Sequence, residues 1–460
     1  MDLQVNTTIK TSIGEITILE ADSKLKGAQG RIFKVKYNGE IYALKDGIGA
    51  NCNGATIEEI EYLLRHGPGS RLFVWPERLL EYNGEYAYLM KYVSDEYKTI
   101  KDSLYELTPK TCLGACINLC DAFQALFDNK LCYKDVSQKN ILVRASDGDI
   151  RIIDNDNVTP VDQIDSPHVV GSKHMVAPEI LDGKVQPNAK SDLWSLAVLL
   201  FLLLVGCYAN KDYRFDHLSD DPEVKKLSDV EKVHYINEKF YSSDNVHFIF
   251  ADDPINLDKY ISKQNPNWKE YIYTWSILPS YLKEDFLNTF VHGIKDYDKR
   301  TNMDRWKKDC IRALASRYEC PHCGKIGFFD YQYMKSHNLL DLKKPYNCQC
   351  PNANCNKTIK IPFMKAKWIP NEPSIIINLD NNDLFNVYFS YSQERIKKIA
   401  EVKYNQRGLL FITNLSDFAF NRDGSFGRNE DSPVFFRYEK IPNPKMNRIE
   451  IFGVKCEVFY

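Results

Sequence analysis

The chain has 460 residues, of which 44% are hydrophobic and 27% charged, and its formal net charge is −2. This length exceeds a single ordinary core, so we expect about three domains, and the apolar content is typical of a folded protein rather than a disordered one. The small net charge excludes a global attraction to nucleic acid or to an anionic membrane, so we expect neither as a partner.

Targeting signals and the distribution of cysteines indicate the cellular compartment in which the protein is expected. The N-terminus lacks a basic region followed by an apolar run, so no signal peptide is expected. The longest apolar stretch, residues 193–208, is shorter than the roughly 20 residues that span a bilayer and predicts a buried helix. Of the 13 cysteines, five lie between Cys320 and Cys355. Scattered thiols with one cluster suit a reducing compartment and a metal site, so we expect a cytoplasmic protein.

The first 50 residues are predicted to form antiparallel strands. Apolar and polar residues alternate in short blocks, and Asn38-Gly39 is typical of a hairpin turn. Between the first blocks, Gly27 and Gly30 would let the backbone close over the phosphates of a ligand. Two glycines in a turn are also common without such a role.

A strand and a helix follow the hairpin turn. The strand Tyr42-Ala43-Leu44-Lys45 is apolar and ends in a single lysine. Residues 56–66 have acids at the front and apolar residues at helical spacing, which predicts a helix with Thr56 as its N-cap. The acids of this helix that could pair with Lys45 are Glu58, Glu59 and Glu61.

The middle of the chain carries oxygen ligands on a loop and at the end of a hairpin. An amphipathic helix over residues 111–131 leads to a loop with Asp135 and Asn140, five residues apart. There a carboxylate can receive the proton of a hydroxyl while an amide oxygen binds magnesium. A short hairpin over 141–153 then delivers Asp154, the second carboxylate that a magnesium site needs.

These motifs occur in the order found in protein kinases, which the chain resembles. Residues 133–140 resemble the catalytic loop, residues 42–45 the Val-Ala-Ile-Lys strand and residues 25–30 the glycine-rich loop. Later matches are Asp154-Asn155-Asp156 for Asp-Phe-Gly, Ala177-Pro178-Glu179, Asp192 in the apolar helix, and Arg300, which would pair with Glu179.

The resemblance implies a bilobal α+β fold, with an N-lobe over 1–93 and a C-lobe over 94–317. It implies transfer of the γ-phosphate of ATP to serine or threonine of a protein substrate, with magnesium, or manganese in its place, as the metal. Asp135 would accept the hydroxyl proton, and Asn140 and Asp154 would hold the metal. The residues implied to bind ATP are Gly27, Gly30, Ala43, Lys45, Glu59, Met90, Tyr92, Asn140 and Asp154, with Glu59 chosen as the partner of Lys45.

The catalytic loop also departs from the family pattern. Ser137 replaces the lysine that serine/threonine kinases place two residues after the catalytic aspartate, and Lys139 is proposed to supply the missing charge. The alternative is a solvated lysine. Ser172 resembles the threonine before Ala-Pro-Glu, which favours serine or threonine as the acceptor. Because of the Ser137 replacement, the alternative function is a pseudokinase scaffold that binds protein partners through its C-terminal parts.

A zinc ribbon is predicted over residues 318–360. Cys320-Pro-His-Cys323 followed by glycine is a zinc knuckle, since each such turn offers two sulfurs to a tetrahedral ion. Cys350 and Cys355 are the expected second pair, with Cys348 as the rival of Cys350. A redox pair is the alternative interpretation.

Residues 361–460 predict a small β-sandwich or barrel, because short apolar runs are separated by turn residues. The runs lie at 374–378, 385–389, 409–412 and 449–452. Part of this region resembles forkhead-associated domains, which bind phosphothreonine; a protein-contact module is the alternative. The whole layout resembles bacterial tellurite-resistance-associated kinases. That resemblance implies a von Willebrand A-domain protein and a metal-dependent protein phosphatase as partners.

Overall fold

The structure is a computed structural model of the full chain. It describes residues 3–21, 30–48, 55–134, 136–161, 174–210, 222–251, 268–337, 347–350, 352, 354–355, 357–361, 363–366, 375–378, 385–389, 397–404, 410–414, 447–451 and 454–459. The chain divides into two compact units, residues 1–272 with 284–307 and residues 273–283 with 308–460.

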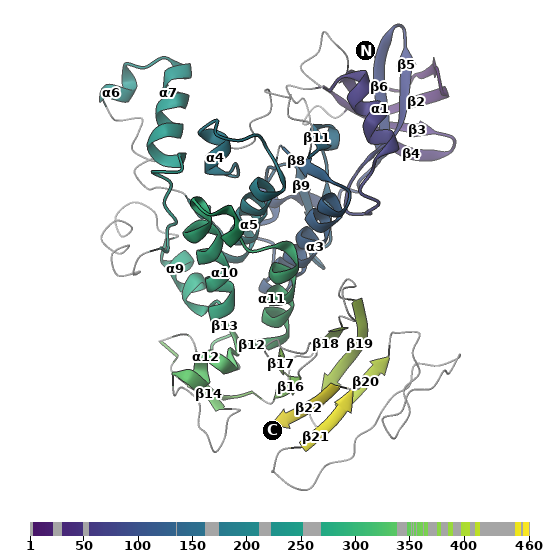
Figure 1. The fold of residues 1–460 in the computed structure, drawn as a ribbon. Helices are drawn as coiled ribbons and strands as arrows, with labels where there is room; N and C mark the ends of the chain where they lie inside the picture. The colour runs from purple at the N-terminus through teal and green to yellow at the C-terminus, as the bar shows by residue number, and fades with distance from the viewer. Residues whose placement is uncertain are drawn as a thin grey trace. The chain divides into compact units, whose positions relative to one another are not determined.

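The first unit begins with a six-stranded antiparallel sheet in the order β1-β2-β3-β4-β6-β5 (Figure 1). Its strands are β1 (Thr8–Thr11), β2 (Gly14–Ala21), β3 (Ile32–Tyr37), β4 (Glu40–Ile48), β5 (Pro76–Tyr82) and β6 (Glu85–Lys91). Asn38 and Gly39 join β3 to β4 with φ angles of 49° and 86°. Positive φ at both positions is what a two-residue hairpin turn requires, so the predicted turn is confirmed.

Helix α1 (Ile57–Arg65) follows β4 and confirms the predicted helix. Thr56 is its N-cap, and the side chains of Thr56 and Glu59 each bond the other's backbone N–H to close a capping box. This arrangement satisfies two amide groups that the first helical turn leaves without intrahelical acceptors.

Helix α5 (Ala189–Val205) is the centre of the helical part of the first unit. Its side chains from Ser191 to Val205 are all buried, as expected for a helix that is apolar on every side. It starts at the N-cap Asn188 and stops at Gly206, whose φ is 93°. Phe201 packs edge-on against Phe286 at 5.1 Å between ring centroids. The predicted buried helix is thus confirmed, and no helix of the described residues is long and apolar enough to cross a membrane.

The chain also contains other helical segments. They are α2 (Ile100–Ser103), α3 (Pro109–Asp128), α4 (Pro178–Leu181), α6 (Pro222–Lys225), α7 (Asp229–Ile236), the π-helical turn η3 (Asn237–Tyr241), α9 (Trp268–Ile277), α10 (Ser280–Phe290) and α11 (Met303–Ser316), with 3-10 turns η4 (His292–Ile294) and η5 (Tyr297–Lys299).

The second unit includes helical segments that the resemblance to kinases places in the C-lobe. Residues 273–283 and 308–316 belong to it, whereas the predicted boundary follows residue 317. Local contacts account for the difference. Asp330 accepts hydrogen bonds from the N–H and hydroxyl of Ser280, at 2.8 and 2.6 Å, and the Arg312 guanidinium lies 3.7 Å from the Tyr281 ring centroid. These helix segments therefore pack with the cysteine-rich region.

Strands dominate the rest of the second unit. Two hairpins, β12 (Arg317–Glu319) with β13 (Ile326–Phe328) and β14 (Asn347–Gln349) with β15 (Thr358–Lys360), flank α12 (Tyr331–Ser336). A four-stranded sheet in the order β17-β16-β22-β21 and a three-stranded sheet β18-β19-β20 follow. Their strands are β16 (Phe363–Ala366), β17 (Ile375–Asn378), β18 (Phe385–Phe389), β19 (Lys397–Tyr404), β20 (Leu410–Asn414), β21 (Asn447–Ile451) and β22 (Val454–Phe459). The four predicted apolar runs all coincide with strands, while their assembly into a sandwich or barrel stays a prediction.

Candidate active site

Tyr133 anchors the predicted catalytic loop at its start. It ends β8 (Leu131–Tyr133), and only 1% of it is exposed. Its N–H donates to the Asp192 carboxylate of α5 at 3.1 Å, and its hydroxyl donates to the Ile153 carbonyl at 2.8 Å. Burial raises the pKa of Asp192 to about 8, against the opposing effect of the Tyr133 N–H. One tyrosine thus ties the loop to the buried helix and to the residue before Asp154.

The loop itself folds back so that its end meets the same segment. The Asn140 N–H donates to the Ser137 carbonyl at 3.0 Å, and the Asn140 carbonyl accepts from the Ile153 N–H at 2.9 Å. Asn140 and Asp154, the predicted magnesium ligands, are therefore held by neighbouring backbone. Asp135 lies outside the described residues.

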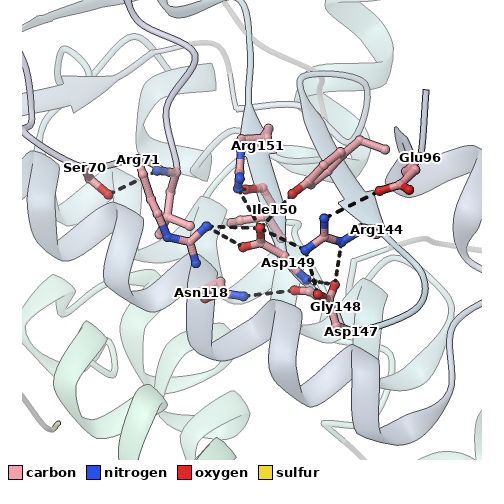
Figure 2. Close-up of polar contacts among 12 residues, drawn as sticks. Ser70, Arg71, Glu96, Asn118, Arg144, Asp147, Gly148, Asp149, Ile150 and Arg151 are labelled. Carbon is pink, nitrogen blue, oxygen red and sulfur yellow. Dashed lines mark hydrogen bonds and ion pairs between the residues drawn. The ribbon is translucent and has the colours of Figure 1, made fainter. Parts of the chain in front are cut away.

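Strands β9 (Ile141–Arg144) and β10 (Ile150–Ile152) form the predicted hairpin between these two residues. Figure 2 shows that Asp149, the residue just before β10, is the centre of the polar contacts drawn there. Its carboxylate accepts from Arg71 at 3.1 Å, from Tyr97 at 2.7 Å and from Arg151 at 2.9 Å. Burial alone would raise the pKa of Asp149, but the bonds from Arg71 and Tyr97 and the nearby guanidinium charges lower it to about 2. The ionised Asp149 carboxylate therefore holds the hairpin in position through these hydrogen bonds. The short strand β7 (Tyr97–Thr99) also supports the hairpin, because it pairs with β9.

The hairpin turn packs directly on α3. Gly148 has a φ of 76°, and a Cβ atom there would lie 2.3 Å from the Thr111 carbonyl oxygen. The Gly148 carbonyl accepts from the Asn118 side-chain amide at 3.0 Å (Figure 2). A glycine is therefore needed both for the backbone conformation and for the close approach.

The buried Lys45 side chain reaches two carboxylates that follow β10. Its ammonium contacts Asp154 and lies 2.7 Å from Asp156 Oδ2. The Lys45 and Asp156 side chains are 5% and 4% exposed, while Asp154 is 29% exposed. Burial alone would lower the pKa of Lys45, but the two acids outweigh it and raise that pKa. Burial raises the pKa of Asp156 to about 6, with Lys45 opposing.

A sharp turn presents both acids. Asp154 adopts the left-handed conformation with φ 61° and ψ 48°, and the 3-10 turn η1 (Asn155–Asn157) follows it before β11 (Val158–Pro160). Asn155, which stands where kinases have phenylalanine, is 2% exposed. Its side-chain amide donates to the carbonyls of Val74 and Ile152, each at 2.9 Å. Hydrogen bonds thus fix a segment that an apolar ring would otherwise anchor.

The expected pairing of Lys45 with Glu59 differs from the contacts in this structure. The Glu59 carboxylate accepts the Thr56 N–H at 2.8 Å, and the Glu59 N–H donates to the Thr56 hydroxyl at 3.2 Å. Because the glutamate caps its own helix, the acids at Lys45 come from residues 154–156. Sequence reasoning gave Asp156 no role, although a second acid two residues after Asp154 was the available signal.

The register of β4 and β6 places two other predicted nucleotide-binding residues, Ala43 and Met90. Ala43 lies opposite Met90, and Lys45 lies opposite Tyr88. Since side chains alternate along a strand and cross-strand neighbours share a face, Ala43, Lys45 and Met90 lie on one face of the sheet. Tyr92, just after β6, donates its hydroxyl to Asp95 at 3.3 Å.

The remaining predicted residues are only partly described. Gly30 has a φ of 147°, and a Cβ atom there would lie 2.1 Å from the Asp46 carbonyl oxygen. Lys139 is exposed, and its N–H donates to the Ser137 hydroxyl at 3.3 Å. Gly27 and Ser172 lie outside the described residues.

A buried ion pair joins two distant motifs of the first unit. Arg300 donates to both oxygens of Glu179 at 2.7 and 2.8 Å, and both side chains are fully buried. Arg300 also donates to the carbonyls of Gly293 and Lys190, each at 2.9 Å. The predicted pairing of these two residues is confirmed.

In the second unit, the four predicted zinc ligands lie together. The sulfur atoms of Cys320, Cys323, Cys350 and Cys355 all lie within 4.8 Å of one another. Two of these separations are 3.9 Å, between Cys320 and Cys355, and 3.6 Å, between Cys323 and Cys350. Sulfurs around a tetrahedral zinc ion are about 3.8 Å apart, whereas a disulfide requires about 2.05 Å. The donor set therefore fits zinc.

Cys348, the alternative to Cys350 as a zinc ligand, lies outside this group of four sulfur atoms. It lies within β14 opposite Ile359 and is 2% exposed. Burial raises the pKa of its thiol to about 12. Cys350 directly follows the strand, at the turn that also carries Cys355. The geometry therefore places Cys350 in the cluster and Cys348 in the core beside Tyr318.

Comparison with known proteins identifies the family. The family model of the protein kinase domain matches residues 23–268, more than half of the chain. The chain belongs to the protein kinase family. Its first unit is thus the bilobal kinase fold, and ATP and magnesium are the donor and metal that the domain implies.

This kinase also resembles a curated relative. It is 30% identical over 98 residues to a probable serine/threonine-protein kinase, mkcF, of Dictyostelium discoideum. The match covers 21% of this chain and 14% of that protein. The kinase therefore spans only a small part of the length of that relative.

Proposed function

We propose that this kinase transfers the γ-phosphate of ATP to serine or threonine of a protein substrate. The observation that carries the proposal is the buried Lys45 ammonium beside Asp154, two residues that lie 109 positions apart in the sequence. A fixed cation next to a carboxylate can hold phosphate oxygens on one side and a metal on the other. The similarity to a probable serine/threonine-protein kinase supports the choice of acceptor.

Each predicted residue then has a task. Asp135 accepts the proton of the substrate hydroxyl, and Lys45 binds the α- and β-phosphates. Asn140 and Asp154 offer the amide and carboxylate oxygens that magnesium prefers, and the Asp154 side chain is 29% exposed, which leaves it open to a ligand. When bound, the ion neutralises charge on the phosphate oxygens. Lys139, an exposed lysine on the same loop, supplies further positive charge there, and Ser172 orients Asp135.

Phosphoamino-acid analysis tests the proposal. The purified kinase is incubated with γ-labelled ATP, magnesium and a mixture of protein substrates, and the labelled protein is hydrolysed in acid. We expect label in phosphoserine or phosphothreonine with the unaltered kinase and none with Asp135→Ala. Label in phosphotyrosine alone would contradict the acceptor. No label with either protein would favour the pseudokinase scaffold.

We propose further that residues 318–360 form a zinc ribbon. The sulfur separations and the two matching hairpin turns support it. We expect one zinc per chain by elemental analysis, a loss of zinc in Cys350→Ser and unchanged zinc in the matched control Cys348→Ser. Loss of zinc in Cys348→Ser but not in Cys350→Ser would show that Cys348 is the ligand and Cys350 is not. An unaltered chain without zinc would contradict the ribbon.

For residues 361–460 we propose a small β-sandwich or barrel that recognises proteins. The two antiparallel sheets support it. A forkhead-associated type of phosphothreonine recognition is the more specific form of the proposal. On the resemblance to tellurite-resistance-associated kinases, the proposed partners are a von Willebrand A-domain protein and a metal-dependent protein phosphatase.

A further inference from the structure

Asp156 is a buried acid that the proposed reaction does not use. We infer that Asp156 is the positioning residue for Lys45, the task for which the sequence predicted Glu59. This inference rests on the proposed function in one respect, since it takes Lys45 to be the residue that binds the phosphates.

The first support is the contact itself. Asp156 Oδ2 lies 2.7 Å from the Lys45 ammonium, and both side chains are at most 5% exposed. Charges at this separation attract strongly where water is excluded. Asp154 also contacts Lys45, but it is 29% exposed and is the proposed metal ligand. Asp156 is therefore the partner that can stay with Lys45 when Asp154 turns to a metal.

The second support is the backbone that carries Asp156. Asn155, the residue before it, is fixed by its two hydrogen bonds to the carbonyls of Val74 and Ile152. The position of Asp156 is thus set by the segment just before β5, which contains Val74, and by β10, which contains Ile152. The Glu59 carboxylate, by contrast, is used in the capping box of α1. Lys45 is consequently positioned without a carboxylate from α1.

The third support is an oxygen atom with spare bonding capacity. Among the described residues, Asp156 Oδ1 is buried and has no hydrogen-bond partner. Buried acceptors almost always have a partner, so an unpaired one calls for an explanation, of which a functional role is one. A carboxylate that holds Lys45 through one oxygen and keeps the other for the nucleotide complex provides that reason.

Two matched variants test the inference. Asp156→Asn removes the charge at nearly constant shape. Glu59→Gln removes the other candidate charge, and glutamine can still close the capping box. With magnesium present, we measure the affinity for a non-hydrolysable ATP analogue by calorimetry and kcat/KM for phosphate transfer. We expect Asp156→Asn to lower kcat/KM by about 100-fold, as misplacement of a positioned group does, and to weaken the analogue's binding. We expect Glu59→Gln to lower both quantities less than Asp156→Asn does.

A nucleotide-free measurement separates this inference from the proposed function. Melting temperatures of Lys45→Met, Asp156→Asn and the double variant form a cycle in which contacting residues are non-additive. We expect the double variant to melt no lower than Asp156→Asn alone, because removing one partner leaves a buried charge. The same cycle with Glu59→Gln is expected to be additive.

Defined outcomes would overturn the inference. These are additive melting shifts for Lys45 and Asp156, or a loss of nucleotide affinity in Glu59→Gln as large as that in Asp156→Asn. If Asp156→Asn does not fold, a folded double variant supports the inference and an unfolded one contradicts it. The melting temperatures can be measured even if the chain transfers no phosphate. Failure of the proposed function can therefore be distinguished from failure of this inference.

Discussion

Asp154→Asn is expected to lower the rate of phosphate transfer by about 1000-fold, while the protein stays folded. The amide keeps the shape of the side chain but removes the negative charge that is proposed to hold the metal. Metal stabilisation of transferring oxygens contributes several kcal/mol, and each 1.36 kcal/mol changes the rate tenfold. Initial rates at saturating ATP and magnesium measure the effect.

Asp147→Asn is the matched control for this variant. Asp147 lies in the turn of the same hairpin, is 50% exposed and pairs with Arg144 at 2.7 Å. The same chemical change there is expected to leave the rate nearly unaltered. Equal rates for Asp154→Asn and the unaltered kinase would show that Asp154 is not a metal ligand.

Arg300→Met is expected to destabilise the kinase domain by about 3–5 kcal/mol, because it leaves the buried Glu179 carboxylate without its cation. Glu179 and Arg300 are both fully buried, so water cannot take the place of the guanidinium. Urea unfolding, followed by tryptophan fluorescence, measures the loss; Trp194 and Trp306 lie in the same unit and are fully buried.

The control for the ion pair is Asp298→Asn, which removes a surface pair two residues away. Lys190 and Asp298 are 2.7 Å apart but 49% and 84% exposed. Water and salt screen exposed pairs, which contribute little to stability, so this variant should be nearly as stable as the unaltered kinase. Comparable losses of unfolding free energy in Arg300→Met and Asp298→Asn would mean that burial does not determine how much the Arg300–Glu179 pair stabilises the domain.

Local patterns in the sequence predict much of the fold. The Asn38-Gly39 turn and the apolar helix after Asn188 depend on residues that are neighbours in the chain, and both are confirmed. The pairing of Arg300 with Glu179 was also predicted, but only by resemblance to a family.

Competition between contacts explains what the sequence could not decide. Thr56-x-x-Glu59 is itself a capping-box signature, so the sequence indicates that Glu59 can cap its own helix. The sequence does not indicate whether the Glu59 carboxylate binds Thr56 or Lys45. That choice depends on where the turn at Asp154 brings Asp156, more than 100 residues from Lys45.

The cysteines and the last strands show the same limit. Spacing alone leaves Cys348 and Cys350 as rivals, and the strand register separates them by burying Cys348 opposite Ile359. Apolar runs predict the C-terminal strands, but not that β16 lies between β17 and β22 in one sheet. Such pairings join distant residues and have no local signature.

Transfer of label from γ-labelled ATP by the purified chain, compared with Asp135→Ala, is the most direct test of a magnesium-dependent kinase. We expect magnesium-dependent incorporation into protein by the unaltered chain and none by the variant. Equal incorporation by both proteins, or none by the unaltered chain, would contradict the assignment of Asp135, Lys45 and Asp154 to phosphate transfer.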